Sequence, residues 1–234
     1  MARLKGGSLG RTSGKLGNKV YRVMNGKNFV SYRPDKYNIS QSKAAISHRA
    51  KFSIMIEFAK YINSISTIKQ IWKAPRIKGT TSFNRIVMYN SKFVCDKSPT
   101  VNNIITPSNS IVNKNIIQFP FKEFHFSKEI GIIKIIMMNS SSSFEYNQDY
   151  TLTFVLMCQE PKRKKDKFFT LDHFEESYSI TKDLSEINIE LNEELSVSLH
   201  KYKKLIIYFS ASRKVDGRLK YIWSSSCSKD FPLE

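Results

Sequence analysis

Cysteine is rare in this 234-residue sequence, and its three copies lie far apart. Cys95, Cys158 and Cys227 are odd in number, and no two of them have the close spacing of a zinc site. The pattern argues against a disulfide framework of the kind that stabilises small secreted proteins. We therefore interpret the three residues as reduced thiols in a cytoplasmic protein.

Long hydrophobic runs are missing as well. The longest apolar stretches, such as residues 130–138, are too short to cross a bilayer and are interrupted by Gly131 and Lys134. The first residues are basic and lack the apolar segment of a secretory signal. A cytoplasmic location without membrane attachment is therefore expected. The 41% of apolar residues suffices for packed cores.

Acidic residues are scarce in the first part of the chain. Residues 1–97 contain 20 Lys or Arg and only three acids, Asp35, Glu57 and Asp96, which leaves them with +17 of the total net charge of +18. Residues 98–234 are nearly balanced, with 18 basic and 17 acidic residues. This asymmetry predicts two functional parts, of which the first faces a polyanion.

The basic part begins with a glycine-rich segment that predicts a β-hairpin. Residues 19–24 and 27–33 are both β-prone. Asn25-Gly26 lies between them, and this dipeptide is the one that two-residue hairpin turns prefer. Pro34 ends the second strand, because proline cannot donate a hydrogen bond to a neighbouring strand.

Apolar spacing predicts three helices after the hairpin. The first runs from Ser40 or Ser42, either of which can cap it, to about Asn63. The second covers residues 66–73 with Ser66 as its cap, and the third covers residues 83–93. The expected buried stripe of the first helix consists of Ala45, His48, Phe52, Met55, Ala59 and Ile62.

The rest of the chain predicts a β domain. Residues 98–115 lack periodicity and are rich in Ser, Asn, Pro and Thr, which is typical of a linker. Over residues 116–234, short strands with turn-like breaks predict an antiparallel β-sandwich. The expected strands cover residues 116–119, 121–126, 130–138, 150–158, 177–182, 187–191, 195–199, 205–210 and 219–224, with a helix over 191–204 as an alternative. The predicted fold class is α+β, with a basic module over residues 1–97.

Basic side chains in the first 51 residues form the candidate polyanion-binding site. In the hairpin region they alternate with Tyr21, Phe29 and Tyr32, so that phosphate neutralisation and ring stacking could combine on one ribbon. Nucleic acid and an acidic protein surface are equal alternatives as the partner. The candidate residues are Arg3, Lys5, Arg11, Lys15, Lys19, Arg22, Lys27, Arg33, Lys43 and Lys51.

Other motifs do not support catalysis or metal binding. The spacing from Gly10 to Gly14 is one residue short of a phosphate-binding loop, and Leu16 replaces the metal-binding hydroxyl. The acids and histidine of residues 172–176 would alternate between the two sides of a strand, which disfavours a shared metal ion. Residues 162–165 are interpreted as a solvated basic loop, and His48 as a core residue. We predict no enzyme activity, no cofactor and no metal.

The same first part of the chain carries a longer pattern, in residues 5–6, 14–22, 25–27 and 34, which continues in residues 42–45, 49–52, 71–73 and 79–84. In this pattern the chain resembles an uncharacterised protein family of Bacteroidota genomes and their phages, and residues 205–217 match it more loosely. The resemblance implies a basic hairpin, an immunoglobulin-like β region and no assigned enzyme activity. Because members occur near mobile elements, it also implies a virion or assembly role.

Two functions are consistent with these observations. The first is a non-enzymatic structural or assembly protein of a phage or phage-derived element, whose basic module docks on nucleic acid or on an acidic protein surface while the β domain makes protein contacts. The alternative is a DNA- or RNA-binding protein without sequence specificity, because no helix-turn-helix or zinc-finger spacing is present. Protein–protein assembly or oligomerisation is expected, and a small-molecule substrate is not.

Overall fold

The chain divides into two compact units, Met1–Ile46 and Ser47–Glu234. The computed structural model describes residues 2–3, 13–24, 26–33, 39–73, 77–107, 119–128, 131–138, 144–215, 218–222 and 227–233. This division differs from the predicted boundary at residue 97. The reason is that the helices after residue 47 share a hydrophobic core with strands of the β domain.

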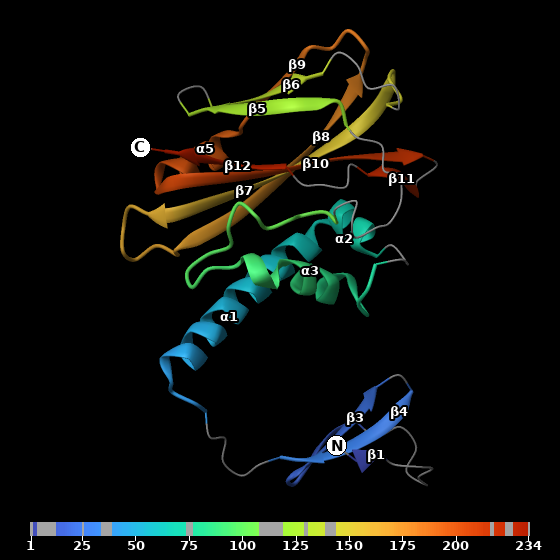
Figure 1. Cartoon of the computed structure of the whole chain (residues 1–234), viewed down its shortest axis with the longest axis vertical. Coiled ribbons are helices and arrows are strands. Elements are labelled where there is room, and N and C mark those ends of the chain that lie inside the picture. The colour runs from blue at the N-terminus through green and yellow to red at the C-terminus, as the bar shows by residue number, and fades with distance from the viewer. Residues whose placement is uncertain are drawn as a thin grey trace. The chain divides into compact units, whose positions relative to one another are not determined.

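The first unit contains a four-stranded antiparallel sheet, drawn in blue in Figure 1. We call it the basic sheet. Gly26 has a φ of +72°, which suits the primed turns that join such strands, and Asn25 lies outside the described residues. The predicted hairpin is thus confirmed. Its strands, in the spatial order β1-β4-β3-β2, are β1 (Ala2–Arg3), β2 (Gly14–Leu16), β3 (Lys19–Met24) and β4 (Lys27–Tyr32).

The predicted helices are present as α1 (Lys43–Ser64), α2 (Ser66–Trp72) and α3 (Ser82–Asn90), followed by a 3-10 turn over Ser91–Phe93. Ser42 caps α1, because its hydroxyl accepts a hydrogen bond from the Ala45 amide at 3.3 Å. Ser66 is not a cap. The residue at the N-cap position of α2 is Ile65, whose side chain cannot accept a hydrogen bond.

Only the second half of the predicted α1 stripe is buried. Met55, Ala59 and Ile62 are fully covered, whereas His48 is exposed and Phe52 is 57% exposed. The interpretation of His48 as a core residue is therefore wrong. Periodicity identifies the apolar side of a helix, but the neighbouring elements decide how far along the helix that side is covered.

Two antiparallel sheets follow the helices. The larger has the order β11-β10-β7-β8, and β12 also pairs with β10; the smaller has the order β5-β6-β9. The α+β class is confirmed, and the immunoglobulin-like arrangement is not. The strands are β5 (Phe121–Ser127), β6 (Ile132–Met137), β7 (Gln148–Pro161), β8 (Phe169–Ile180), β9 (Glu186–Glu190), β10 (Tyr202–Val215), β11 (Arg218–Ile222) and β12 (Cys227–Pro232).

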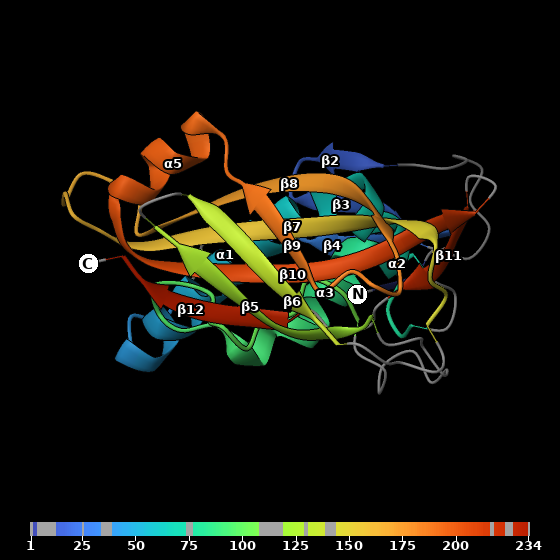
Figure 2. The same ribbon diagram turned by 90° about the horizontal axis from the view of Figure 1, so that it is seen from above.

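The second unit has three layers, with the large sheet between the small sheet and the helices (Figures 1 and 2). Successive residues of β10 show this arrangement, because Ile207 packs in the core shared with the small sheet while Ile206 packs in the core shared with the helices. Both faces of β7 and β10 are covered, so their central residues form continuous buried runs.

The predicted linker is part of this packing. Residues 98–107 lie among the helices and the large sheet, and their carbonyls accept buried hydrogen bonds from Trp72 Nε1, Gln159 Nε2 and the Tyr208 hydroxyl at 2.7–2.8 Å. Residues 108–118 lie outside the described residues. A segment can lack periodicity and still be fixed, because side chains from other elements satisfy its backbone.

Two further expectations differ from the structure. Residues 195–199 are helical, within α5 (Glu193–His200), where Asn192 accepts a hydrogen bond from the Leu195 amide at 2.9 Å. This outcome is the alternative that the sequence left open. Strand β8 begins at Phe169 rather than at residue 177; the adjacent polar pairs 172–173 and 175–176 interrupt the apolar alternation that marks a strand in the sequence.

Candidate functional site

The register of the basic sheet places Lys15, Arg22 and Lys27 on one face, together with the position of Arg3. Residues paired across an antiparallel sheet share a face, and successive residues along a strand alternate between faces. The three side chains are exposed and surround Phe29. We call this side the basic face. The pairs that define it are Lys15 with Val20, Arg22 with Phe29, and Met24 with Lys27.

The opposite face is more aromatic. Lys19 lies there, and its Nζ is 5.6 Å from the ring centroid of Tyr32, a cation–π geometry. Tyr21 and Val30 are paired beside it. Lys19 is therefore partly engaged within the sheet, in contrast to the exposed cations of the basic face.

The remaining predicted residues do not join the basic face as a group. Arg33 follows β4, whereas Arg3 of β1 is paired with Phe29, so its register position does fall on the basic face. Lys5 and Arg11 lie outside the described residues. Lys43 is exposed at the start of α1, and Lys51 forms an exposed ion pair with Asp96 at 3.4 Å. Lys51 therefore already has a carboxylate partner within the second unit.

The basic sheet has no core among the residues that the structure describes. No residue of 13–24, 26–33 and 39–46 is buried, and the exposed fractions of Leu16, Tyr32 and Met24 are 70%, 69% and 51%. An isolated sheet needs an apolar face packed on another layer to be stable in water. Residues 1–46 contain ten Lys or Arg and one acid, so the unit that contains this sheet combines uncovered apolar area with a charge of +9.

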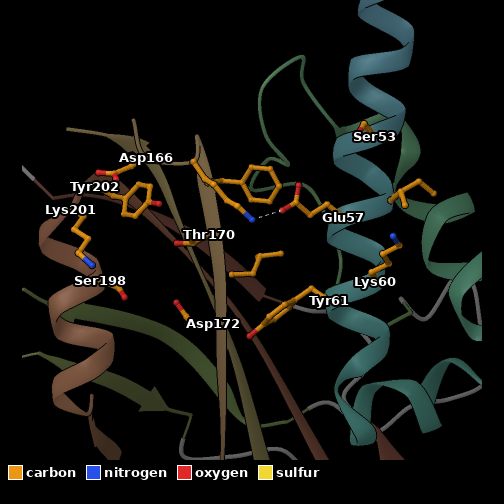
Figure 3. A pocket seen from close by; sticks show the side chains of 14 residues that line it. Ser53, Glu57, Lys60, Tyr61, Asp166, Thr170, Asp172, Ser198, Lys201 and Tyr202 are labelled. Carbon is orange, nitrogen blue, oxygen red and sulfur yellow. Dashed lines mark ion pairs between the residues drawn. The ribbon is translucent and has the colours of Figure 1, made fainter. Parts of the chain in front are cut away.

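A second surface lies at the open edge of the large sheet. Strand β8 is the outermost strand on its side, and among the described strands it pairs only with β7. A groove of about 940 Å³ follows the first residues of β8, with α1 on one side and the end of α5 on the other (Figure 3). We call it the edge groove. Its lining includes Glu57 and Tyr61 of α1, Phe169 to Asp172 of β8, and Ser198, Lys201 and Tyr202.

The carboxylate of Asp172 lies in the edge groove. It forms no hydrogen bond and no ion pair with any residue that the structure describes, although Lys60 and Lys201 line the same groove and the adjacent His173 acts on it electrostatically. Burial raises the pKa of the Asp172 carboxyl. A half-buried carboxylate in an open groove is suited to receive a positively charged side chain from outside.

Two ionisable groups close to Asp172 have a raised pKa. The Tyr61 hydroxyl lies 2.9 Å from Nδ1 of His173, and burial together with the charge of Asp172 raises the pKa of Tyr61 far above its usual value. Burial, with a smaller contribution from Asp172, raises the pKa of the Cys158 thiol to about 12. Neither group is ionised at neutral pH, so neither is an activated nucleophile.

The crowded residues 172–176 separate as strand alternation predicts. The Glu175 carboxylate accepts hydrogen bonds from Thr67 and Thr153 on the helix side of β8. Glu176 lies on the other side and accepts one from the Tyr178 hydroxyl at 2.8 Å. Within the described residues, no three His, Cys, Asp or Glu side chains converge on one point.

The sequence reasoning missed the edge groove. Its elements come from residues 53–61, 166–172 and 198–202, which are brought together only by the fold. One signal was present, because charged side chains, as in residues 172–176, are typical of an exposed edge strand.

Comparison with protein-family models, with curated proteins and with solved structures found no match. Among the described helices, none is both long enough and apolar enough to cross a membrane.

Proposed function

We propose that this chain is a non-enzymatic assembly protein that docks on a negatively charged surface through its basic sheet. The observation that supports the proposal most strongly is the lack of any buried residue in 13–24 and 26–33, which form three strands of the sheet in a unit with a charge of +9. Such a sheet gains a covering layer and counter-charges in the same binding event.

The β domain supplies the rigid part in this proposal. Its central strands are buried on both faces, and the two cores meet in β7 and β10. A rigid body joined to a basic docking sheet suits a structural component of a phage or phage-derived particle. An immunoglobulin-like arrangement of the β region is part of the same proposal and stays a prediction.

Charge reversal on the basic face tests this function. Heparin serves as a generic polyanion, and the measured quantity is the NaCl concentration that elutes the full chain from it. Reversal of Lys15, Arg22 and Lys27 to Glu is expected to lower that concentration, because the three exposed cations act on one face.

The matched control reverses Lys162, Lys164 and Lys165 to Glu, in the exposed turn between β7 and β8. Both variants change the net charge by the same amount. Elution of the two variants at the same salt concentration would contradict the proposal, since total charge rather than the basic face would then determine binding.

Nucleic acid is the alternative partner, and the position of Phe29 among three cations on the basic face favours it. A fluorescently labelled 30-nucleotide single strand tests this candidate. If six or more phosphates are neutralised, the affinity should fall about 10³-fold between 50 and 200 mM salt. Absence of binding at low salt would remove nucleic acid as the partner.

A further inference from the structure

Asp172 of the edge groove is also the first residue of a long acidic stretch of the second unit. Residues 172–194 contain eight acids and one lysine, a net charge of −7 in a chain whose total is +18. They form β8 from Asp172 onward, the connection to β9, β9 itself and the first turn of α5. We call this stretch the acidic edge; β8 and α5 lie along the same side of the molecule in Figure 2.

The strands of the acidic edge are both outer strands. β8 ends the large sheet on this side, and β9 ends the small sheet. An outer strand presents unpaired backbone N–H and C=O groups, which can pair with a strand from another chain. Most acids of this stretch are exposed, including Glu190, Glu193 and Glu194.

The basic sheet matches this surface in three respects. Its outer strand β2 is exposed along its whole length and also has a free edge among the described strands. Its basic face carries cations, whereas the acidic edge carries carboxylates. Its uncovered apolar side chains, such as Leu16 and Met24, need the cover that a second layer would provide.

We propose that the basic sheet of one copy binds the acidic edge of a second copy, adding its strand to the open edge of β8 and placing a lysine or arginine against Asp172. This inference rests on the proposed docking function and names its partner. The two surfaces are different, so the contact is head-to-tail. Repetition of such a contact produces an open fibre or a closed ring rather than a symmetric dimer.

Salt dependence separates this contact from general aggregation. A chain with a net charge of +18 repels its own copies at low ionic strength. Association driven by apolar surface alone would therefore grow stronger with added salt. The proposed contact is expected to weaken at least about tenfold in dissociation constant between 0.05 and 0.5 M NaCl, because the opposite charges are screened.

The decisive experiment is sedimentation velocity on full-length variants over a range of concentrations. The basic-face variant is Lys15→Glu/Arg22→Glu/Lys27→Glu, and the acidic-edge variant is Glu190→Lys/Glu193→Lys. Each alone is expected to stay monomeric where the wild type assembles. Mixed together they should form a one-to-one complex and nothing larger, because each supplies the surface that the other has lost.

A control variant and a milder variant distinguish loss of the contact from misfolding of the variants. Glu123→Lys/Glu160→Lys changes the net charge as much as the acidic-edge variant does, in β5 and at the end of β7, and should assemble as the wild type does. Asp172→Asn removes the carboxylate of the groove without adding bulk, and it should weaken assembly while the fold stays intact.

Several outcomes would overturn the inference. A wild type that stays monomeric at all concentrations in low salt would overturn it. A monomer that becomes more compact when the salt is lowered would do so too, since the basic sheet would then bind within its own copy. Equal assembly of the acidic-edge variant and the wild type would also do so. If the basic-face variant nevertheless elutes from heparin at a lower salt concentration than its control, the docking function stands and the partner is another surface. Binding of the 30-nucleotide strand would then identify that partner as nucleic acid.

Discussion

At the scale of single residues, buried polar side chains fix the segments that lack regular structure. Asn90, at the end of α3, is fully buried. Its amide nitrogen donates to the carbonyls of Ile86 and Ile104, and its oxygen accepts from Asn103 Nδ2 and the Ile104 amide, at 2.7–3.1 Å. The Asn90 side chain thus forms hydrogen bonds with backbone groups of both α3 and the segment that contains Ile104.

Asn90→Ala is expected to destabilise the fold by about 2–4 kcal/mol, since the loss of one side chain leaves several buried groups unpaired. Urea denaturation of the full chain measures this free energy of unfolding. Met88→Ala, at an exposed position of the same helix, serves as the comparison. A loss no larger than that of the comparison would show that water replaces the Asn90 bonds.

Asp172 gives a pH-dependent prediction. Burial raises its folded-state pKa above the value in the unfolded chain, so folding disfavours the ionised form. The resulting destabilisation is absent below the unfolded-state pKa and is complete above the folded-state pKa. Asp172→Asn should therefore raise the melting temperature at neutral pH and have little effect near about pH 3.

The measurement is thermal denaturation at both pH values in high salt, where the proposed assembly is screened. Asp149→Asn, an exposed position of β7, should change neither midpoint. An effect of Asp172→Asn that is larger at acidic than at neutral pH would contradict the assignment.

At the scale of elements, the turn between α2 and α3 is determined by one glycine and one arginine. Gly79 has a φ of +115°, and a Cβ at this position would lie 2.7 Å from Cγ of Arg85. Arg85 donates to the Gly79 carbonyl at 3.1 Å and to the Trp72 carbonyl at 2.6 Å, at the C-terminal end of α2. The guanidinium thus lies where a cation favours the helix dipole.

Gly79→Ala is expected to cost more than about 1 kcal/mol, because both the backbone conformation and the position of Arg85 oppose a side chain. Gly131→Ala is the matched comparison. Its φ is also positive, at +67°, but its added Cβ would meet no atom within 4 Å. Equal losses of unfolding free energy in the two variants would mean that contact with Arg85 is unimportant.

At the scale of the whole molecule, the large sheet joins two cores. The small sheet and α5 cover one face, and the helices cover the other. Because the same strands contribute to both cores, the second unit should unfold as one cooperative body. The basic sheet belongs to the other unit and is held by no comparable core among its described residues.

Two adjacent residues of β10 test this coupling. Ile206→Ala removes a side chain from the helix-side core and Ile207→Ala one from the other core, each at an expected cost of about 2–4 kcal/mol. Both should lower the midpoint of a single urea transition that circular dichroism and tryptophan fluorescence report identically. Midpoints that differ between the two probes would show that the layers unfold separately.

Much of the fold was predictable because its signals are local. Asn25-Gly26 predicted the hairpin, and apolar spacing predicted three helices and most strands. Predictions failed where residues distant in sequence decide the outcome, as for His48, Phe52 and the supposed linker. The hydroxyl of Tyr208 binds the carbonyl of Thr100, which lies 108 residues earlier, and no local pattern reveals such a contact.

The sequence by itself determined the sign and the place of the charge, since both are properties of composition. It also determined the hairpin, because turn geometry and strand alternation depend on neighbouring residues alone. Only the tertiary structure decided which strands are left with open edges, that Asp172 lies unpaired in a groove, and that the basic sheet has no described core. These features depend on how layers stack and where they end, which is set by long-range burial.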